Sequence, residues 1–150
     1  MSEFGIVEDT MFIPMAGRIY ASEKFPGILY DKKALSLLLE TGNQSQYTLL
    51  ASASRSANMD RHIQNFLKRK PDGVVIQLGC GLETTYDRNE NGQTQWYAVD
   101  LPNVIEYRRS LLPEPEKETY LSGDAFSDGW LRQIRRNMPD TPLLVTAGGL

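Results

Sequence analysis

The 150-residue chain has 41% hydrophobic residues and a formal net charge of −3, which is enough apolar sequence for one domain with its own core. Its apolar runs fall far short of the roughly 20 residues that cross a bilayer, and residues 1–20 lack a signal-peptide pattern, so we expect no membrane partner and a cytoplasmic location. The acidic balance disfavours a nucleic-acid partner, and one cysteine with one histidine supplies too few ligands for a structural metal site.

The first 70 residues predict helices with no strand before them. Residues 1–30 show no clean period and are predicted to be irregular apart from one short helix. Asp31 can cap a helix that ends at Gly42. A longer helix is predicted over residues 45–70, ended by Pro71. The apolar positions expected to be buried include Ala34, Leu37 and Leu38 in the first of these helices, and Tyr47, Leu50, Ala53, Ala57, Ile63, Phe66 and Leu67 in the second.

Residues 71–150 alternate short apolar runs with helical stretches, a pattern typical of βαβ units around a parallel sheet. Strands are predicted at residues 73–78, 94–99, 119–121 and 143–146. Helices are predicted at 103–112, opened by Pro102, and from a cap at Asp128 to Met138. Doubly wound sheets usually have more than four strands, so we interpret the chain as a fragment that, isolated, would associate through its unpaired last strand.

A buried strand runs directly into Gly79-Cys80-Gly81, the strongest local motif. Glycines allow a tight turn and a close approach of backbone to ligand at the carboxyl ends of parallel strands. A dinucleotide fingerprint would have a third glycine where this chain has Thr84, which disfavours a pyrophosphate ligand. The alternative is a plain strand-to-loop turn. In either case Cys80 is interpreted as a small packed side chain and not as a nucleophile.

Two acids follow the next strands. Asp100 ends the second strand, about twenty residues after the glycines, where a carboxylate can accept hydrogen bonds from both ribose hydroxyls. Its alternative role is to cap the helix at Pro102. Asp124 follows the third strand and can accept from an adenine amino group while Phe126 packs on the ring, or it is an ordinary turn residue.

Three parts of the chain together resemble the leucine carboxyl methyltransferase family, whose bacterial members are often described as O-methyltransferases of polyketide biosynthesis. They are the run 78–85, the stretch 96–113 with Arg108-Arg109, and Arg55 with Asp60 upstream. The resemblance implies an α/β, Rossmann-like class I methyltransferase sheet. Its first four strands would lie in residues 71–150, behind an N-terminal helical cap or lid at residues 1–70.

The resemblance also implies S-adenosyl-L-methionine as cofactor and a small-molecule acceptor that takes the methyl group on a carboxylate or hydroxyl oxygen. Arg55 would pair with the cofactor carboxylate, and Asp100 would hold the ribose. The remaining expected cofactor contacts are Gly79, Cys80 and Gly81 at the methionine end, Leu101 beside the ribose, and Asp124, Ala125 and Phe126 at the adenine.

The chain departs from the family pattern in two places. Residues 82–85 read Leu-Glu-Thr-Thr where Leu-Asp-Thr-Arg is usual, and residues 146–149 read Thr-Ala-Gly-Gly where Ala-Glu-Gly is common, which removes a carboxylate near the reacting methyl. Methyl transfer requires a well-positioned nucleophile and not a covalent protein intermediate, so no catalytic residue is assigned. His62 is interpreted as a surface residue. A nicotinamide-dependent oxidoreductase and a catalytically inactive binding module stay open as alternatives, as does a homo-oligomer.

Overall fold

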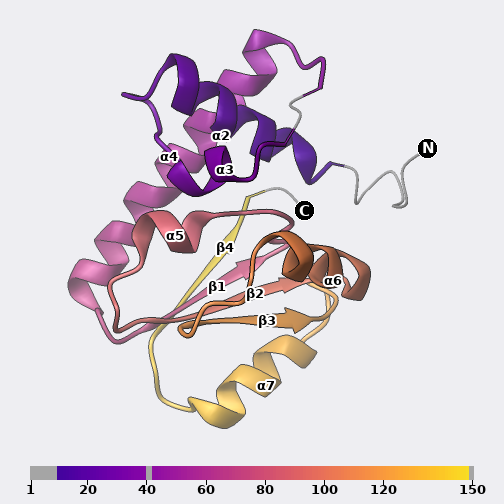
Figure 1. The fold of residues 1–150 in the computed structure, drawn as a ribbon. Coiled ribbons are helices and arrows are strands. Elements are labelled where there is room, and N and C mark those ends of the chain that lie inside the picture. The colour runs from indigo at the N-terminus through magenta and orange to yellow at the C-terminus, as the bar shows by residue number, and fades with distance from the viewer. Residues whose placement is uncertain (1–9, 40–41, 149–150) are drawn as a thin grey trace. The chain divides into compact units, whose positions relative to one another are not determined.

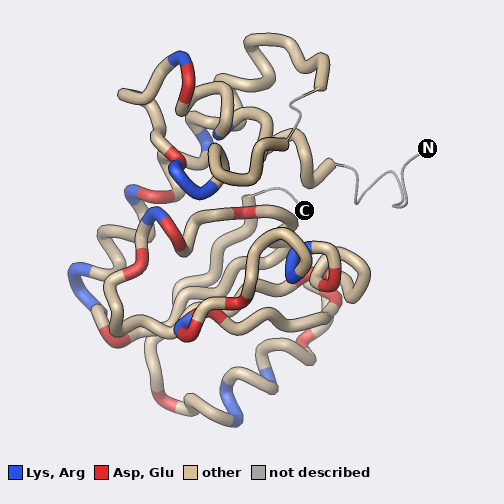
Figure 2. The backbone as a smooth tube through the Cα atoms, viewed as in Figure 1, with Lys and Arg blue, Asp and Glu red and all other residues tan. Residues whose placement is uncertain are grey.

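The computed structural model describes residues 10–39 and 42–148, which form two compact units (Figure 1). The helical unit comprises Met1–Arg61 and Leu82–Asn89, and the sheet unit comprises His62–Gly81 and Glu90–Leu150. Acidic and basic residues are spread over the helices and loops of each unit, while the strands are mostly uncharged (Figure 2). No helix in the described ranges combines the length and the apolar character needed to cross a membrane.

The helical unit contains α2 (Phe12–Lys24), α3 (Lys32–Ser36), the first part of α4 (Gln46–Arg69) and α5 (Thr85–Asn89). The one helix predicted within residues 1–30 is α2, but at 13 residues it is longer than the short helix predicted in an otherwise irregular segment. Its stability comes from packing: Met15 and Ile19 are buried, and Gly17 lies so close to α4 that an added Cβ would be 2.7 Å from the Leu49 carbonyl oxygen. The short helix α5 is not among the helices predicted from the sequence.

Two predicted apolar faces need correction. The helix after Asp31 ends at Ser36, earlier than Gly42, because Leu38 adopts a left-handed φ of 52° that a helix cannot continue. Leu38 is therefore exposed, and so is Tyr47 near the start of α4. The capping role of Asp31 is confirmed, since its carboxylate accepts from the Ala34 N–H at 2.9 Å.

The sheet unit contains four parallel strands in the order β3-β2-β1-β4, which confirms the predicted α/β class. They are β1 (Val74–Leu78), β2 (Gln95–Asp100), β3 (Glu118–Ser122) and β4 (Leu143–Ala147). In the register, Leu78 pairs with Val99, which in turn pairs with Leu121, so the carboxyl ends of the first three strands are level. The loops after these ends carry the candidate site residues.

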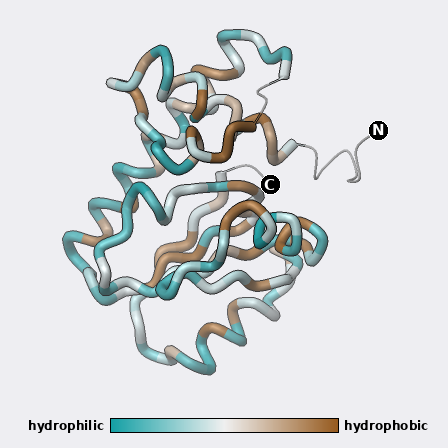
Figure 3. Tube along the Cα trace, viewed as in Figure 1, coloured by the Kyte–Doolittle hydropathy of each residue, from teal (hydrophilic) through white to brown (hydrophobic). Residues whose placement is uncertain are grey.

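Two helices cover opposite faces of this sheet (Figure 1). Side chains of a strand alternate between faces, so Ile76 packs with Ile134 of α7 (Gly129–Asn137), whereas Ala98 packs with Ile105 of α6 (Pro102–Leu111). Hydrophobic residues accordingly run along the central strands (Figure 3). Asp128 precedes α7 as predicted, but its carboxylate pairs with Arg132 instead of capping the backbone.

Candidate functional site

The glycine turn after β1 has the backbone geometry that its sequence predicts. Gly79 and Gly81 have φ values of 61° and 47°, a left-handed conformation that favours glycine because it lacks a Cβ. Between them, Cys80 donates its N–H to the Val99 carbonyl at 3.1 Å and is buried with Ala98. The Cys80 side chain thus belongs to the core, and only its backbone is left to face a ligand.

Asp100 ties three adjacent strand ends together. Its Oδ2 accepts from the Gly81 N–H at 2.8 Å, and its Oδ1 accepts from the Leu101 N–H at 2.8 Å. Its backbone carbonyl accepts from the Gly123 N–H at 2.9 Å. The alternative capping role is not observed, because the N-cap of α6 is Leu101 and no side chain caps this helix. The Asp100 carboxylate instead joins the backbone just before α6 to the glycine turn.

The third strand end carries an exposed aromatic side chain. Asp124 Oδ1 accepts from the Phe126 N–H at 2.9 Å, while its Oδ2 has no partner among the described residues. The ring of Phe126 is 84% exposed and Leu101 is 37% exposed. This edge of the sheet therefore presents an unused carboxylate oxygen and two apolar side chains to solvent.

A buried arginine lies behind the glycine turn. Arg108 on α6 is 1% exposed, and its Nη1 donates to the Gly81 carbonyl at 3.1 Å. Its Nη2 donates to Glu118 at 3.3 Å, and its guanidinium carbon lies 4.7 Å from the ring centroid of Tyr120. Burial opposes the charge, but neighbouring Cys80, Glu118 and Tyr120 outweigh it and raise the pKa of Arg108 above its ordinary value.

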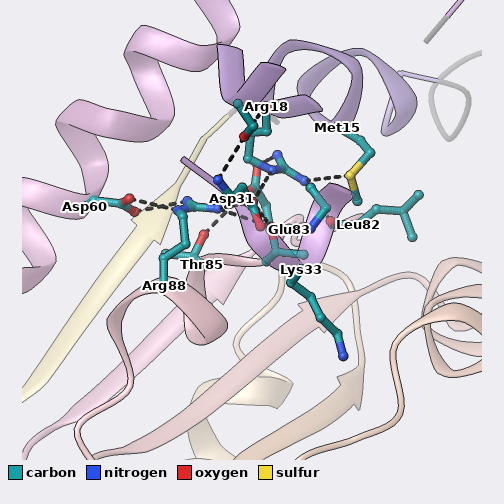
Figure 4. Close-up of polar contacts among 12 residues, drawn as sticks. Met15, Arg18, Asp31, Lys33, Asp60, Leu82, Glu83, Thr85 and Arg88 are labelled. Carbon is teal, nitrogen blue, oxygen red and sulfur yellow. Dashed lines mark hydrogen bonds and ion pairs between the residues drawn. The ribbon is translucent and has the colours of Figure 1, made fainter. Parts of the chain in front are cut away.

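The helical unit has a buried polar network of its own, drawn in Figure 4. Asp31, fully buried, pairs with Arg88 at 2.7 Å and with Arg18 at 3.3 Å. Arg88 also forms a two-bond pair with Asp60, at 2.8 and 3.0 Å, and Arg18 reaches Glu83 at 3.0 Å. Burial would lower the pKa of Arg88, but Asp60, Asp31 and Glu83 raise it above its ordinary value.

The same network anchors the segment that follows the glycine turn. Arg18 Nη2 donates to the Leu82 carbonyl at 2.8 Å, and the Thr84 hydroxyl donates to Asp31. Glu83, which stands where aspartate is usual in the resemblance, accepts from Arg18 and from the Thr85 hydroxyl at 3.2 Å. The departures at Glu83 and Thr85 are thus accommodated within a satisfied set of hydrogen bonds.

Comparison with known proteins decides the family. The model of the leucine carboxyl methyltransferase family matches residues 11–137, which is most of the chain. The chain belongs to the leucine carboxyl methyltransferase family. The match covers both units, including the glycine turn, Asp100 and Arg108.

Two curated relatives support this membership. The tetracenomycin polyketide synthesis O-methyltransferase TcmP of Streptomyces glaucescens is 36% identical over 97 residues, covering 64% of this chain and 35% of the relative. The S-adenosyl-L-methionine-dependent methyltransferase dpfgK of Gibberella zeae is 28% identical over an alignment of 165 positions, covering 95% of this chain and 54% of the relative. The chain thus spans about a third and about half of the length of these two relatives.

The structure brings together the predicted site residues of the sheet unit. Gly81 and Leu101 are joined to Asp100 by hydrogen bonds, and the 123–126 loop is joined to Asp100 through Gly123. Gly79 lies in the same turn as Gly81. Their roles toward a cofactor stay predictions.

The other residues singled out in the sequence lie elsewhere. Arg55 lies on the exposed side of α4 in the helical unit, with no hydrogen bond or ion pair to a described residue, and its role also stays a prediction. His62 is exposed, and Gly149 lies outside the described residues.

Arg108 lies within the segment that carries the family resemblance, but its burial was not predicted from the sequence. A signal was present: Arg108 follows Val104 by four residues and Ile105 by three, so all three share one helical face. A charged residue in the apolar stripe of a helix indicates a buried cation with partners. Its acidic partner Glu118 lies on the neighbouring strand β3 and could not be named from spacing.

Proposed function

We propose that the protein to which this chain belongs is an S-adenosyl-L-methionine-dependent O-methyltransferase that acts on a small molecule. The observation that carries the proposal is the linkage of Gly81 to Asp100 at the carboxyl edge of a parallel sheet, in a chain of the leucine carboxyl methyltransferase family. The named activities of its relatives, polyketide O-methylation by TcmP and S-adenosyl-L-methionine dependence in dpfgK, support it.

The side chains and backbone at this edge of the sheet fit an adenosyl cofactor. A carboxylate has about four lone-pair sites, and Asp100 uses one on each oxygen for backbone N–H groups, so about two are left for ribose hydroxyls. The unused Oδ2 of Asp124 suits an adenine amino group, and the exposed Leu101 and Phe126 suit the faces of its ring. Gly79 and Gly81 leave room for close backbone contact.

The residues of this chain would bind and orient the cofactor and exclude water. When bound, the cofactor would supply a sulfonium methyl group that an oxygen nucleophile can attack in line, the C–S bond breaking as the O–C bond forms and S-adenosylhomocysteine leaving. Asp100 would hold the ribose in register with the glycine turn, because the same carboxylate bonds both. Our proposal for the acceptor extends only to a small molecule with a carboxylate or hydroxyl oxygen.

Titration calorimetry on the full-length protein tests this proposal. We expect S-adenosylhomocysteine to bind and NADH not to bind. Replacing Asp100 with alanine removes two charge-assisted ribose bonds worth about 1.5–3 kcal/mol each, so affinity should fall by roughly 10²- to 10⁴-fold. Asp128→Ala serves as the matched control, since among the described residues the Asp128 carboxylate pairs only with the exposed Arg132. The assignment would be overturned if NADH bound while neither S-adenosyl-L-methionine nor S-adenosylhomocysteine did, or if the Asp100 variant bound S-adenosylhomocysteine with unchanged affinity.

A binding module without catalysis is the second candidate. It is favoured by the sequence at the end of β4, where residues 146–149 read Thr-Ala-Gly-Gly and lack the carboxylate of the Ala-Glu-Gly common in the family. Transfer of a radiolabelled methyl group to a panel of small carboxylic acids and phenols separates the two candidates. Cofactor binding without transfer to any of these acceptors would support the module.

A further inference from the structure

We propose that Arg108 is a positioning residue that sets the Gly79-Cys80-Gly81 turn for the adenosyl cofactor. This inference rests on the proposed function, since it assigns a role at the same site. Arg108 would not touch the cofactor. It would act through Gly81, to which its Nη1 donates at 3.1 Å.

Gly81 is held at both of its polar groups. Its N–H donates to Asp100 Oδ2 at 2.8 Å, and its carbonyl accepts from Arg108. Its φ is 47°, and glycine adopts positive and negative φ values about equally readily, so the backbone at Gly81 would have other conformations open to it without these two bonds. Fixing both groups selects one orientation of the turn, and it also fixes the Asp100 oxygen that the turn engages.

Arg108 is itself held on several sides. Its side chain and that of Glu118 are each 1% exposed and lie 3.3 Å apart. Tyr120, whose ring lies 4.7 Å from the guanidinium carbon, is anchored by donating its hydroxyl to the Leu112 carbonyl at 2.9 Å. A planar guanidinium can donate in two directions while stacking on an aromatic face, whereas the compact lysine ammonium cannot reproduce both donor directions. The site is therefore specific for arginine.

The next residue is a matched control. Arg109 also lies on α6, with its guanidinium carbon 5.8 Å from the Tyr120 ring centroid. Its side chain is 49% exposed and pairs with Glu114 at 3.3 Å, and its Nη2 donates to the Tyr120 carbonyl at 3.3 Å. It thus shares the helix, the charge and the aromatic neighbour of Arg108, but it has no bond to Gly81.

Amide NMR of the full-length protein tests the effect on the turn without any cofactor. Cys80 is the single cysteine of this sequence, so labelling cysteine carbonyls with ¹³C and glycine nitrogens with ¹⁵N selects the Cys80–Gly81 peptide within it. Arg108→Lys should shift the Gly81 amide resonance, and Arg109→Lys should leave it in place. Equal effects of the two variants, or no shift in either, would overturn the positioning role.

Calorimetry with S-adenosylhomocysteine tests the consequence for binding. Loss of one charge-assisted bond behind the turn should weaken binding about tenfold in Arg108→Lys, while Arg109→Lys should stay within about twofold of the parent protein. Arg135→Lys controls for general destabilisation, because Arg135 also donates to backbone carbonyls, at residues 138, 139 and 141, away from the glycine turn. A loss of affinity in Arg135→Lys equal to that in Arg108→Lys would indicate a merely structural role.

A milder variant keeps the test decisive if Arg108→Lys does not fold. Glu118→Gln preserves the shape of the partner but removes its charge, so the Gly81 amide should still shift and affinity should fall by less than in the arginine variant. Unchanged resonance and affinity in Glu118→Gln would then overturn the inference. If the parent protein itself does not bind S-adenosylhomocysteine, the proposed function fails, and the cofactor role of Arg108 fails with it. The amide measurement still reports separately whether Arg108 sets the turn.

Discussion

Replacement of Asp31 by alanine is expected to lower the free energy of unfolding of the helical unit by about 4 kcal/mol. Asp31 is fully buried, and its carboxylate accepts from the Ala34 N–H and lies 2.7 Å from Arg88 and 3.3 Å from Arg18. Breaking a buried ion pair costs about 3–5 kcal/mol, and loss of a helix N-cap adds about 1 kcal/mol. Arg88 keeps Asp60 and Arg18 keeps Glu83, so the lower end of the ion-pair range applies.

Urea denaturation of the full-length protein, followed by circular dichroism, measures this loss. Hydrogen exchange of the amides in α2 and α3 then locates it in the helical unit. The control is Asp128→Ala, which removes an exposed pair to Arg132 four residues along α7 and should cost about 0.3–0.5 kcal/mol. If the two variants lose stability within about 1 kcal/mol of one another, the argument that the buried network stabilises this unit is wrong.

Two further predictions concern packing and pH. Gly17→Ala should lower the melting temperature, because its Cβ would lie 2.7 Å from the Leu49 carbonyl oxygen. The cost of this overpacking, about 1–3 kcal/mol, exceeds the gain in helix propensity. In the control Gly27→Ala, the added Cβ meets no atom within 4 Å, so this variant should be tolerated. A melting temperature of Gly17→Ala at or above that of the parent would contradict the close approach of α2 and α4. Burial raises the pKa of Tyr120 to about 12 from 10.0 in the unfolded chain, so its contribution to stability is complete below pH 10 and is lost as the pH rises toward 12. Denaturation at several pH values should show a shallower alkaline decline for Tyr120→Phe than for the parent protein, and parallel curves would refute this.

The sequence by itself determined the parallel α/β class and the candidate edge of the sheet. Both follow from local patterns: buried runs predict strands, and glycine or aspartate directly after a run marks its carboxyl end. Parallel strands place these ends at one edge, so Gly81 and Asp100 could be expected to meet although 19 residues separate them. The family resemblance, carried by the same segments, was confirmed by the match over residues 11–137.

Only the tertiary structure decided which charged residues are buried and with which partners. Arg18 bonds Glu83, which is 65 residues away in the sequence, and Asp31 bonds Thr84, which is 53 residues away. No rule of sequence spacing predicts such pairs. The length and bounds of α2 were not predicted for a related reason: this helix is stabilised where Gly17 approaches α4, and not by a clean period of its own. Local sequence indicates the type and period of an element. Burial of a charge depends on a partner that the folded chain brings from elsewhere, because an unpaired charge would not be tolerated in the core.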